Sequence, residues 1–264
     1  SAPAYRTGIP DNLKFLFVGM QYFNKKALER DRADWNAWSG LTDEMMLRPN
    51  ALLEGHAMPA VYVGELDYDI KHCFRTGMVG ADFDSVMHHW ATQGLNYYVL
   101  SQLLWDPAAN QESIVDDYCR KGFGPAAGHV RNYFRLVEEL TGKVASENSG
   151  NIDETEDLTR LRYNFLNEIP RFYTQDELDK LSGILEQAYQ ATTPDSRERL
   201  RVEFLQAGLY YAYSTSEFLR RYHAGERKQL RDFLEKRHAR LMKIRERFPF
   251  AVNYPEIAAK EWGL

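Results

Sequence analysis

Cysteine is scarce in this sequence, since Cys73 and Cys119 are the only two in 264 residues. Two cysteines so far apart do not form the framework of a disulfide-stabilised domain, so we expect buried free thiols. Long apolar runs are also absent, because no stretch reaches the roughly 20 residues that a membrane-spanning helix needs. The sequence therefore argues against a disulfide scaffold and predicts no membrane partner.

An excess of positive charge is lacking as well. The formal net charge is −5, so the whole chain offers no electrostatic basis for binding nucleic acid. The sequence contains no phosphate-binding glycine loop, no serine nucleophile elbow and no zinc-ligand spacing, so we expect no cofactor and no metal. It begins at Ser1-Ala-Pro3 without a signal peptide or an initiator methionine, which predicts a processed protein or a piece of a longer one.

Apolar and aromatic residues are plentiful. They make up 44% and 13% of the chain, which is typical of a folded globular protein. The length allows one large domain or two smaller ones. The 16 tyrosines and five tryptophans suit a packed core and also the stacking surfaces of a sugar-binding site.

The first part of the chain alternates between strand and helix patterns, which favours parallel β/α units. We expect strands at 13–18, 45–53 and 78–83, and helices at 25–38, 65–75 and 88–107. Pro49 removes a backbone donor, so the second strand should be interrupted or lie at a sheet edge. A closed β/α barrel needs eight strands, and only three or four are found here. The expected fold is therefore α/β, either the C-terminal part of a barrel or a small open sheet.

From Asn110 onward the pattern is helical and predicts a bundle. We expect Asn110 to cap a helix that Gly122 stops, and Pro125 to open the next helix. Residues 143–151 should form a loop. Thr174 should begin a capping box, and Thr193-Pro194 should open a long helix. The last long helix should run over 226–248. We predict a barrel portion over residues 1–108 and a helical domain over 109–264.

Three carboxylates are candidates for catalysis. Asp82 and Asp84 lie two apart in the third strand pattern, so both should face the same side of the sheet. Two like charges side by side raise one pKa, as a general acid requires. Asp84 is favoured because reactive groups lie at the C-terminal ends of barrel strands, and Glu54 ends the second strand. The alternative is that these side chains face solvent or cap a helix.

The helix over 88–107 carries the candidate substrate-binding residues. Trp90, Gln93 and Asn96 lie near its start, away from much of its apolar stripe, and His88 precedes them. We predict that Asp84, Trp90 and Asn96 line one concave pocket. Further ligands from the second strand would be Arg48 and Asn50. Core packing of Trp90, helix capping by His88 and a loop-tying role for Asn96 are the alternatives.

Four runs in this region resemble a known family: Gly94-Leu-Asn96-Tyr-Tyr, Leu103-Leu-Trp105-Asp-Pro107, Asp116-Asp-Tyr118 and Gly122-Phe-Gly124-Pro-Ala-Ala127. They are similar to the C-terminal part of domain-of-unknown-function family 4838. That family is linked to glycoside hydrolase family 163, which contains endo-β-N-acetylglucosaminidases of N-glycans. A weaker likeness, through the Asn-aromatic-Tyr and Trp-Asp-Pro runs, leads to the family 67 α-glucuronidases. The resemblance is clearest over roughly residues 45–135.

The resemblance implies a secreted, periplasmic or cell-surface glycoside hydrolase that acts on complex glycans. In such an enzyme the acetamido group of the substrate acts as nucleophile beside an acidic general acid. The resemblance places that pair upstream of Ser1, so the upstream half of the same barrel is an expected partner and the chain alone is expected to be inactive. The alternatives are a non-catalytic carbohydrate-binding module and a helical interaction module.

The segment 220–247 is strongly basic, with eleven Lys and Arg against four Asp and Glu. A nucleic-acid-binding helix would have this charge. The acids are interspersed, however, and apolar residues recur along the segment at Leu230, Phe233, Leu234, Leu241 and Ile244. We therefore expect the solvated face of a bundle helix and no nucleic-acid partner.

Overall fold

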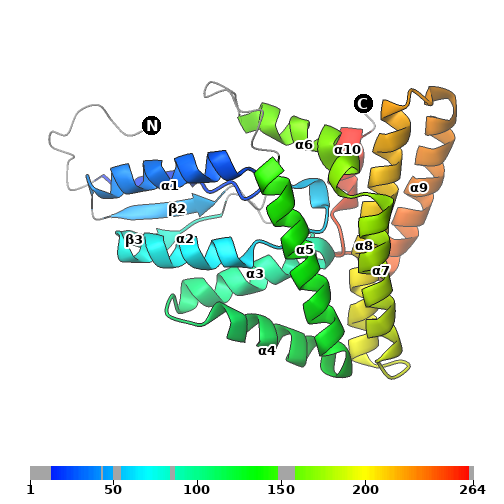
Figure 1. Ribbon diagram of the computed structural model, residues 1–264, viewed down its shortest axis with the longest axis horizontal. Coiled ribbons are helices and arrows are strands. Elements are labelled where there is room, and N and C mark those ends of the chain that lie inside the picture. The colour runs from blue at the N-terminus through cyan, green and yellow to red at the C-terminus, as the bar shows by residue number, and fades with distance from the viewer. Residues whose placement is uncertain (1–12, 43, 50–54, 84–86, 148–157, 262–264) are drawn as a thin grey trace.

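The computed structural model describes residues 13–42, 44–49, 55–83, 87–147 and 158–261 (Figure 1). Its three strands are β1 (Phe15–Gly19), β2 (Met45–Pro49) and β3 (Met78–Ala81). The α-helices are α1 (Lys25–Ser39), α2 (Val63–Arg75), α3 (Trp90–Trp105), α4 (Gln111–Phe123), α5 (Ala127–Glu147), α6 (Leu158–Phe172), α7 (Gln175–Gln190), α8 (Arg197–His223), α9 (Arg227–Arg247) and α10 (Tyr254–Glu261). Two short 3-10 turns, η2 (Gly55–Ala57) and η3 (Gly124–Ala126), lie between them.

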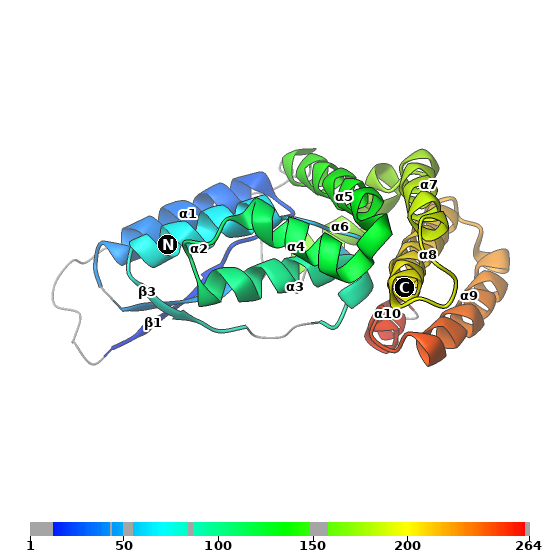
Figure 2. The same ribbon diagram turned by 90° about the horizontal axis from the view of Figure 1, so that it is seen from below.

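The sheet is parallel throughout and has the order β1-β2-β3. The chain thus advances by one strand at each crossover in the same direction. Since crossovers of parallel strands share one hand, α1 and α2 lie on the same face of the sheet, as Figure 2 shows. The predicted α/β class with parallel β/α units is confirmed.

Helices cover one face of the sheet, and the other face is largely exposed within the described chain. On one face the ring of Phe17 meets that of Trp35 from α1 edge-on, with 5.5 Å between centroids. On the other face Leu16 and Val18 are 42% and 51% exposed. Parallel sheets are normally buried on both sides, so this open apolar face is an unusual feature of the described chain.

Pro49 is the last residue of β2, and β2 is the central strand of the three. The alternative that placed this strand at a sheet edge is therefore wrong. At the end of the strand the missing N–H of Pro49 interrupts no further ladder bond within the described residues.

Helix α8 is central to the second half of the chain and contacts α3, α4, α6, α7 and α9, while α5 packs on α4 and α7. Buried apolar side chains form one main cluster that extends from Met20 to Ala258. The core therefore continues across the predicted boundary at residue 108, and the division into two domains stays a prediction.

The C-terminal segment returns to the start of α3. The N–H groups of Trp90 and Ala91 donate to the carbonyl oxygens of Phe250 (3.2 Å) and Ala251 (2.9 Å). The first N–H groups of a helix have no partner within the helix, so a distant segment satisfies them here. This contact fixes the N-terminal end of α3 against the bundle.

Two of the predicted helix starts are confirmed. The Asn110 side chain accepts from the N–H of Ser113 at 2.9 Å, and Thr174 Oγ1 accepts from the N–H of Glu177 at 3.3 Å. Pro125 lies in the turn η3 that leads into α5, and α9 ends just before Phe248.

Several predicted boundaries are wrong. Gly122 lies inside α4, and Gly124 ends the helix because it adopts a left-handed φ of 49°. The expected loop at 143–151 is helical as far as Glu147, since Val144 is buried and continues the apolar stripe. The long helix α8 begins after its cap Ser196 and not at Thr193. The sequence patterns also do not predict α6, which has a proline inside it, or the short α10.

A close helix crossing generates a stability prediction. A Cβ atom on Gly208 of α8 would lie 2.8 Å from Ala91 Cβ and 2.9 Å from Thr92 Cγ2 of α3. Gly208→Ala should therefore lower the free energy of unfolding by about 1–3 kcal/mol through overpacking. The matched control is Gly183→Ala in α7, where no atom lies within 4 Å, and which should raise stability by about 0.5–1 kcal/mol. Urea denaturation of both variants checks the opposite signs.

Candidate functional site at the carboxyl ends of the strands

Strained backbone gathers in the loops that follow the three strands. Five non-glycine residues in the described chain have positive φ, and four of them lie in these loops: Met20 (64°), His56 (45°), Ala57 (56°) and His88 (58°). Such conformations are costly for residues with a Cβ, and they concentrate where a protein positions functional groups. These loops are therefore the candidate site.

The loops after β1 and β2 meet at Gly55, which has a φ of 82°. A Cβ there would lie 2.6 Å from the ring of Phe23 and 3.3 Å from Gln93 Nε2. Phe23 comes from the loop after β1 and Gln93 from α3. The site thus joins three chain segments around a position that only glycine fits.

Asp31 of α1 supports the loop after β1. Its carboxyl lies beside the backbone N–H groups of the buried Met20 and Gln21, and so contacts the loop where Met20 has a left-handed φ. Asp31 Oδ2 has no hydrogen-bond partner among the described residues. Burial of this side chain raises the pKa of Asp31 from 3.8 to about 6.

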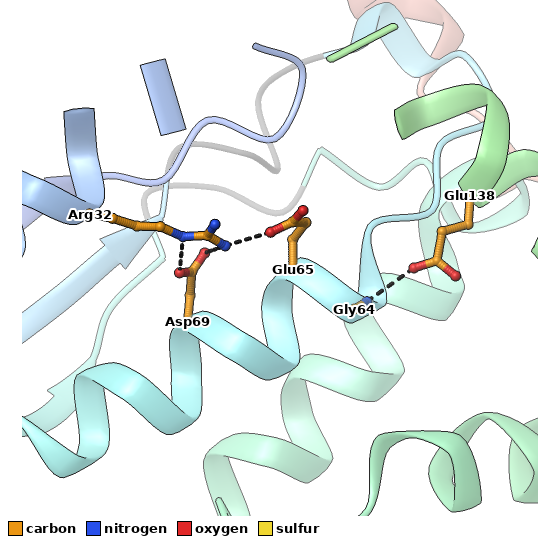
Figure 3. Close-up of polar contacts among 5 residues, drawn as sticks. All are labelled: Arg32, Gly64, Glu65, Asp69 and Glu138. Atoms are coloured by element: carbon orange, nitrogen blue, oxygen red, sulfur yellow. Dashed lines mark hydrogen bonds and ion pairs between the residues drawn. The ribbon is translucent and has the colours of Figure 1, made fainter. Parts of the chain in front are cut away.

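An ionic network ties α1 to α2 beside the same loop (Figure 3). Arg32 donates from Nε to Asp69 Oδ1 at 2.7 Å and also contacts Glu65. Asp69 is fully buried and also accepts from the hydroxyl of Tyr22. Burial raises the pKa of Asp69, while the bonds from Arg32 and Tyr22 act in the opposite direction. The network connects α1 and α2 to the loop after β1.

The segment 55–64 after β2 runs from η2 through irregular backbone into the first turn of α2, and it is buried except at His56 and Gly64. Side chains from the bundle bind its backbone. Glu138 Oε1 accepts from Gly64 N at 3.0 Å (Figure 3), and Thr141 Oγ1 accepts from Val61 N at 3.1 Å. Burial raises the pKa of Glu138. Both side chains come from α5, so the bundle holds this segment directly.

Two tyrosines complete the anchoring of this segment. The hydroxyl of Tyr211 from α8 donates to the carbonyl oxygen of His56 at 2.9 Å. The hydroxyl of Tyr173 donates to the carbonyl oxygen of Pro59 at 2.8 Å. Buried carbonyl groups need such partners, and here the bundle supplies them.

Asn96 also binds this segment. Its Oδ1 accepts from Tyr62 N at 3.0 Å and its Nδ2 donates to the oxygen of Ala60 at 2.8 Å. The Asn96 side chain is fully buried, so it has no surface with which to contact a sugar. Its predicted substrate-binding role is therefore corrected to the alternative of tying down a loop.

Gln93 and Trp90 differ in exposure. Gln93 is buried, and its Oε1 accepts from the hydroxyl of Tyr97 at 3.3 Å. Trp90 is 41% exposed and meets the ring of Tyr97 edge-on at 4.9 Å. His88 lies exposed just before Trp90. The predicted common pocket with Asn96 is not what the structure shows, because Trp90 faces outward and Asn96 inward.

Arg48, the penultimate residue of β2, meets Asp82, which directly follows β3. Arg48 Nη1 lies 3.4 Å from Asp82 Oδ2, and the Asp82 side chain is about half exposed. β3 ends at Ala81, and the N–H of Asp82 still donates to the carbonyl oxygen of Leu47 in β2 at 2.9 Å. The same-face pair of Asp82 with Asp84 stays a prediction. The other predicted site residues, Asp84, Glu54 and Asn50, lie outside the described residues.

Sequence reasoning misses the buried acids Asp31 and Asp69. The apolar spacing of α2 carries a signal for Asp69, which lies three residues after Leu66 and four before Cys73, both buried. That spacing puts Asp69 on the inner stripe of the helix. We find no comparable pattern that identifies Asp31.

Metal and thiol chemistry find little support. Within the described ranges, no group of three or more His, Cys, Asp or Glu side chains is placed to hold a metal ion.

The described helices include none that is both long and apolar enough to cross a membrane. Cys73 and Cys119 are buried free thiols, as predicted, and burial raises the pKa of Cys119 to about 12.

Comparison with known proteins gives one match. The family model described as Domain of unknown function (DUF4838) matches residues 2–135. No curated protein and no solved structure matches the chain. The matched residues contain all three strands and the loops that follow them.

The buried Asp31 gives a pH prediction. Its carboxyl holds a proton in the folded state at pH values where the unfolded chain has released it, so stability falls as pH rises from about 4 to about 6. The substitution Asp31→Asn keeps one side-chain oxygen as a hydrogen-bond acceptor and removes the carboxyl group that titrates. Between pH 5 and pH 7 the free energy of unfolding of the wild type should fall by about 1 kcal/mol more than that of the variant. Urea titrations at both pH values test this, with the exposed Glu29→Gln of the same helix as control.

The role of Asn96 gives a second prediction. Asn96→Ala leaves the buried Tyr62 N–H and Ala60 carbonyl without their partner. The loss should be about 2–4 kcal/mol of unfolding free energy. Gln102→Ala, at an exposed position of the same helix, should change stability by less than about 0.5 kcal/mol. Equal losses in the two variants would contradict the loop-holding role.

Proposed function

The chain belongs to the family described as Domain of unknown function (DUF4838), and we propose that it forms part of a glycoside hydrolase that acts on complex glycans. The observation that carries the proposal is the gathering of strained and polar loops at the carboxyl ends of parallel strands. Active sites of β/α barrels lie at that edge. The similarity of the sequence runs to glycoside hydrolase family 163, and more weakly to family 67, supports the same class.

The winding of the sheet supports a barrel. In a β/α barrel consecutive strands are neighbours, the helices form one outer layer, and the other face of the sheet lines the interior. The order β1-β2-β3, the shared face of α1 and α2, and the exposed Leu16 and Val18 agree with such a sector. We propose that further strands from the upstream half of the same barrel cover the open face and complete the ring.

The accessible side chains at the strand ends suit a sugar. Trp90 offers a half-exposed ring, and aromatic faces pack on the apolar faces of sugar rings. Arg48 and Asp82 form a pair of charged groups that can donate to and accept from hydroxyl groups. In an endo-β-N-acetylglucosaminidase-like reaction the substrate acetamido group would act as nucleophile. The carboxylates Asp82, Asp84 and Glu54 remain the candidates that this chain would add to the site.

A second candidate function is a non-catalytic carbohydrate-binding module, or an interaction module built on the helices. Its support is the sheet itself, since β1 and β3 each pair with only one strand among the described residues. Catalysis needs groups held rigidly on both sides of the bond that breaks, and an open three-stranded sheet is a poor scaffold for that.

Binding through Trp90 is testable with a matched control. Trp90→Ala should weaken binding of a soluble N-acetylglucosamine oligosaccharide about tenfold, because the stacking surface is lost. Trp105→Ala removes a 91% exposed tryptophan from the other end of the same helix and should leave binding unchanged. Calorimetric titration of both variants measures this. A similar loss in the two would show that Trp90 is not a specific platform.

Turnover separates the two candidate functions. We expect the 264-residue chain alone not to hydrolyse a chromogenic N-acetylglucosaminide or a complex N-glycan, because its three described strands do not close a ring. The longest open reading frame that contains the chain, expressed and assayed beside it, should be active. Hydrolysis by the 264-residue chain at a rate comparable to that of the longer protein would contradict the barrel proposal. Inactivity of both proteins would favour the binding module.

A further inference from the structure

A cleft of about 520 Å³ lies in the helical bundle. Side chains of α7, α8 and α9 line it, and Figures 1 and 2 show these helices beside one another. Its size falls in the range of small-molecule sites. None of its lining residues belongs to the segment 2–135 that matches the family model, although Ala207, Ile244 and Phe248 pack around Ala91, next to Trp90.

The cleft has aromatic walls. Tyr189, Tyr210 and Phe248 line it and are each half-buried, so their rings are fixed but reachable. The guanidinium of Arg240 lies 4.8 Å from the ring centre of Tyr210, which orders that cation at the cleft. Aromatic rings with polar groups beside them bind ligands that have an apolar face and a polar edge.

The charges around the cleft do not cancel. Glu203 forms an ion pair with Arg247, and Glu186 accepts a hydrogen bond from the neutral Gln190. In the described part of the chain Arg240 and Lys243 have no carboxylate within ion-pair distance. With Glu203 and Arg247 paired, the charges of Arg240, Lys243 and Glu186 sum to one net positive charge at the cleft.

We propose that this cleft binds an acidic saccharide, a sugar that carries one carboxylate. Arg240 and Lys243 would bind the carboxylate, Tyr189 and Tyr210 would pack on the ring, and Glu186 would accept from hydroxyl groups. A phosphate dianion fits less well, because two lining carboxylates repel it. Duplex nucleic acid fits less well too, because the cations face a concave surface and acids lie between them.

The test uses D-galacturonic acid as probe and D-galactose as its neutral counterpart. Titration followed by saturation-transfer NMR should give at least about tenfold weaker binding of galactose, since a charge-assisted hydrogen bond is lost. Arg240→Gln with Lys243→Gln should weaken binding of galacturonic acid by a similar factor. Arg231→Gln with Lys236→Gln removes two cations of α9 outside the cleft and should leave binding unchanged.

Three results would overturn the proposal. Equal binding of the two sugars would remove the role of charge. An equal loss in the control pair would show that only the general charge of α9 matters. Tighter binding of duplex DNA that depends on Arg240 and Lys243 would assign the cleft to a polyanion. Thermal unfolding of each variant establishes that it is folded, and none of these outcomes bears on the activity at the strand loops.

Discussion

The largely buried stretch over residues 55–64, which leads from η2 through irregular backbone into α2, is the constraint on which the rest of the structure depends. Regular ladders do not serve most of its polar groups, and buried N–H and carbonyl groups need partners. Asn96, Glu138, Thr141, Tyr173 and Tyr211 supply them from helices of the bundle and from α3. The loop after β2 therefore keeps its shape only when the bundle is packed against the sheet, so the bundle is part of the scaffold of the candidate site.

The segment that follows α9 also joins the bundle to the candidate site, through the start of α3. Residues 250–251 satisfy the first N–H groups of α3, and α3 begins with the partly exposed Trp90. The close approach of α8 to α3 at Gly208 fixes the helix from its side. The position of Trp90 thus depends on segments more than 100 residues away, so the matched residues 2–135 contain the site loops but not all that supports them.

The sequence predicts what local chemistry decides. The strands, α1 to α3, and the caps Asn110 and Thr174 follow from apolar spacing and from side chains that bind their own backbone. It predicts poorly what distant partners decide. Asn96 binds backbone 34 and 36 residues away, and Asp69 binds Arg32 at 37 residues. For Asn96 the spacing left two roles open, and burial beside 60–62 decides between them. The placement of Arg48 and His88 at one edge of the sheet follows from pattern, because loops after parallel strands share one edge.

Three acids with raised pKa values, Asp31, Asp69 and Glu138, lie behind the candidate loops and not at their surface. Each bonds backbone or side chains that shape a loop, and burial makes its charge costly at neutral pH. Apolar side chains of similar volume are often no less stabilising at such positions. They could not, however, accept the N–H groups of Met20, Gln21 or Gly64. The acids therefore lower stability in exchange for a defined loop geometry, and that exchange is the physical reason to look for function at this edge of the sheet.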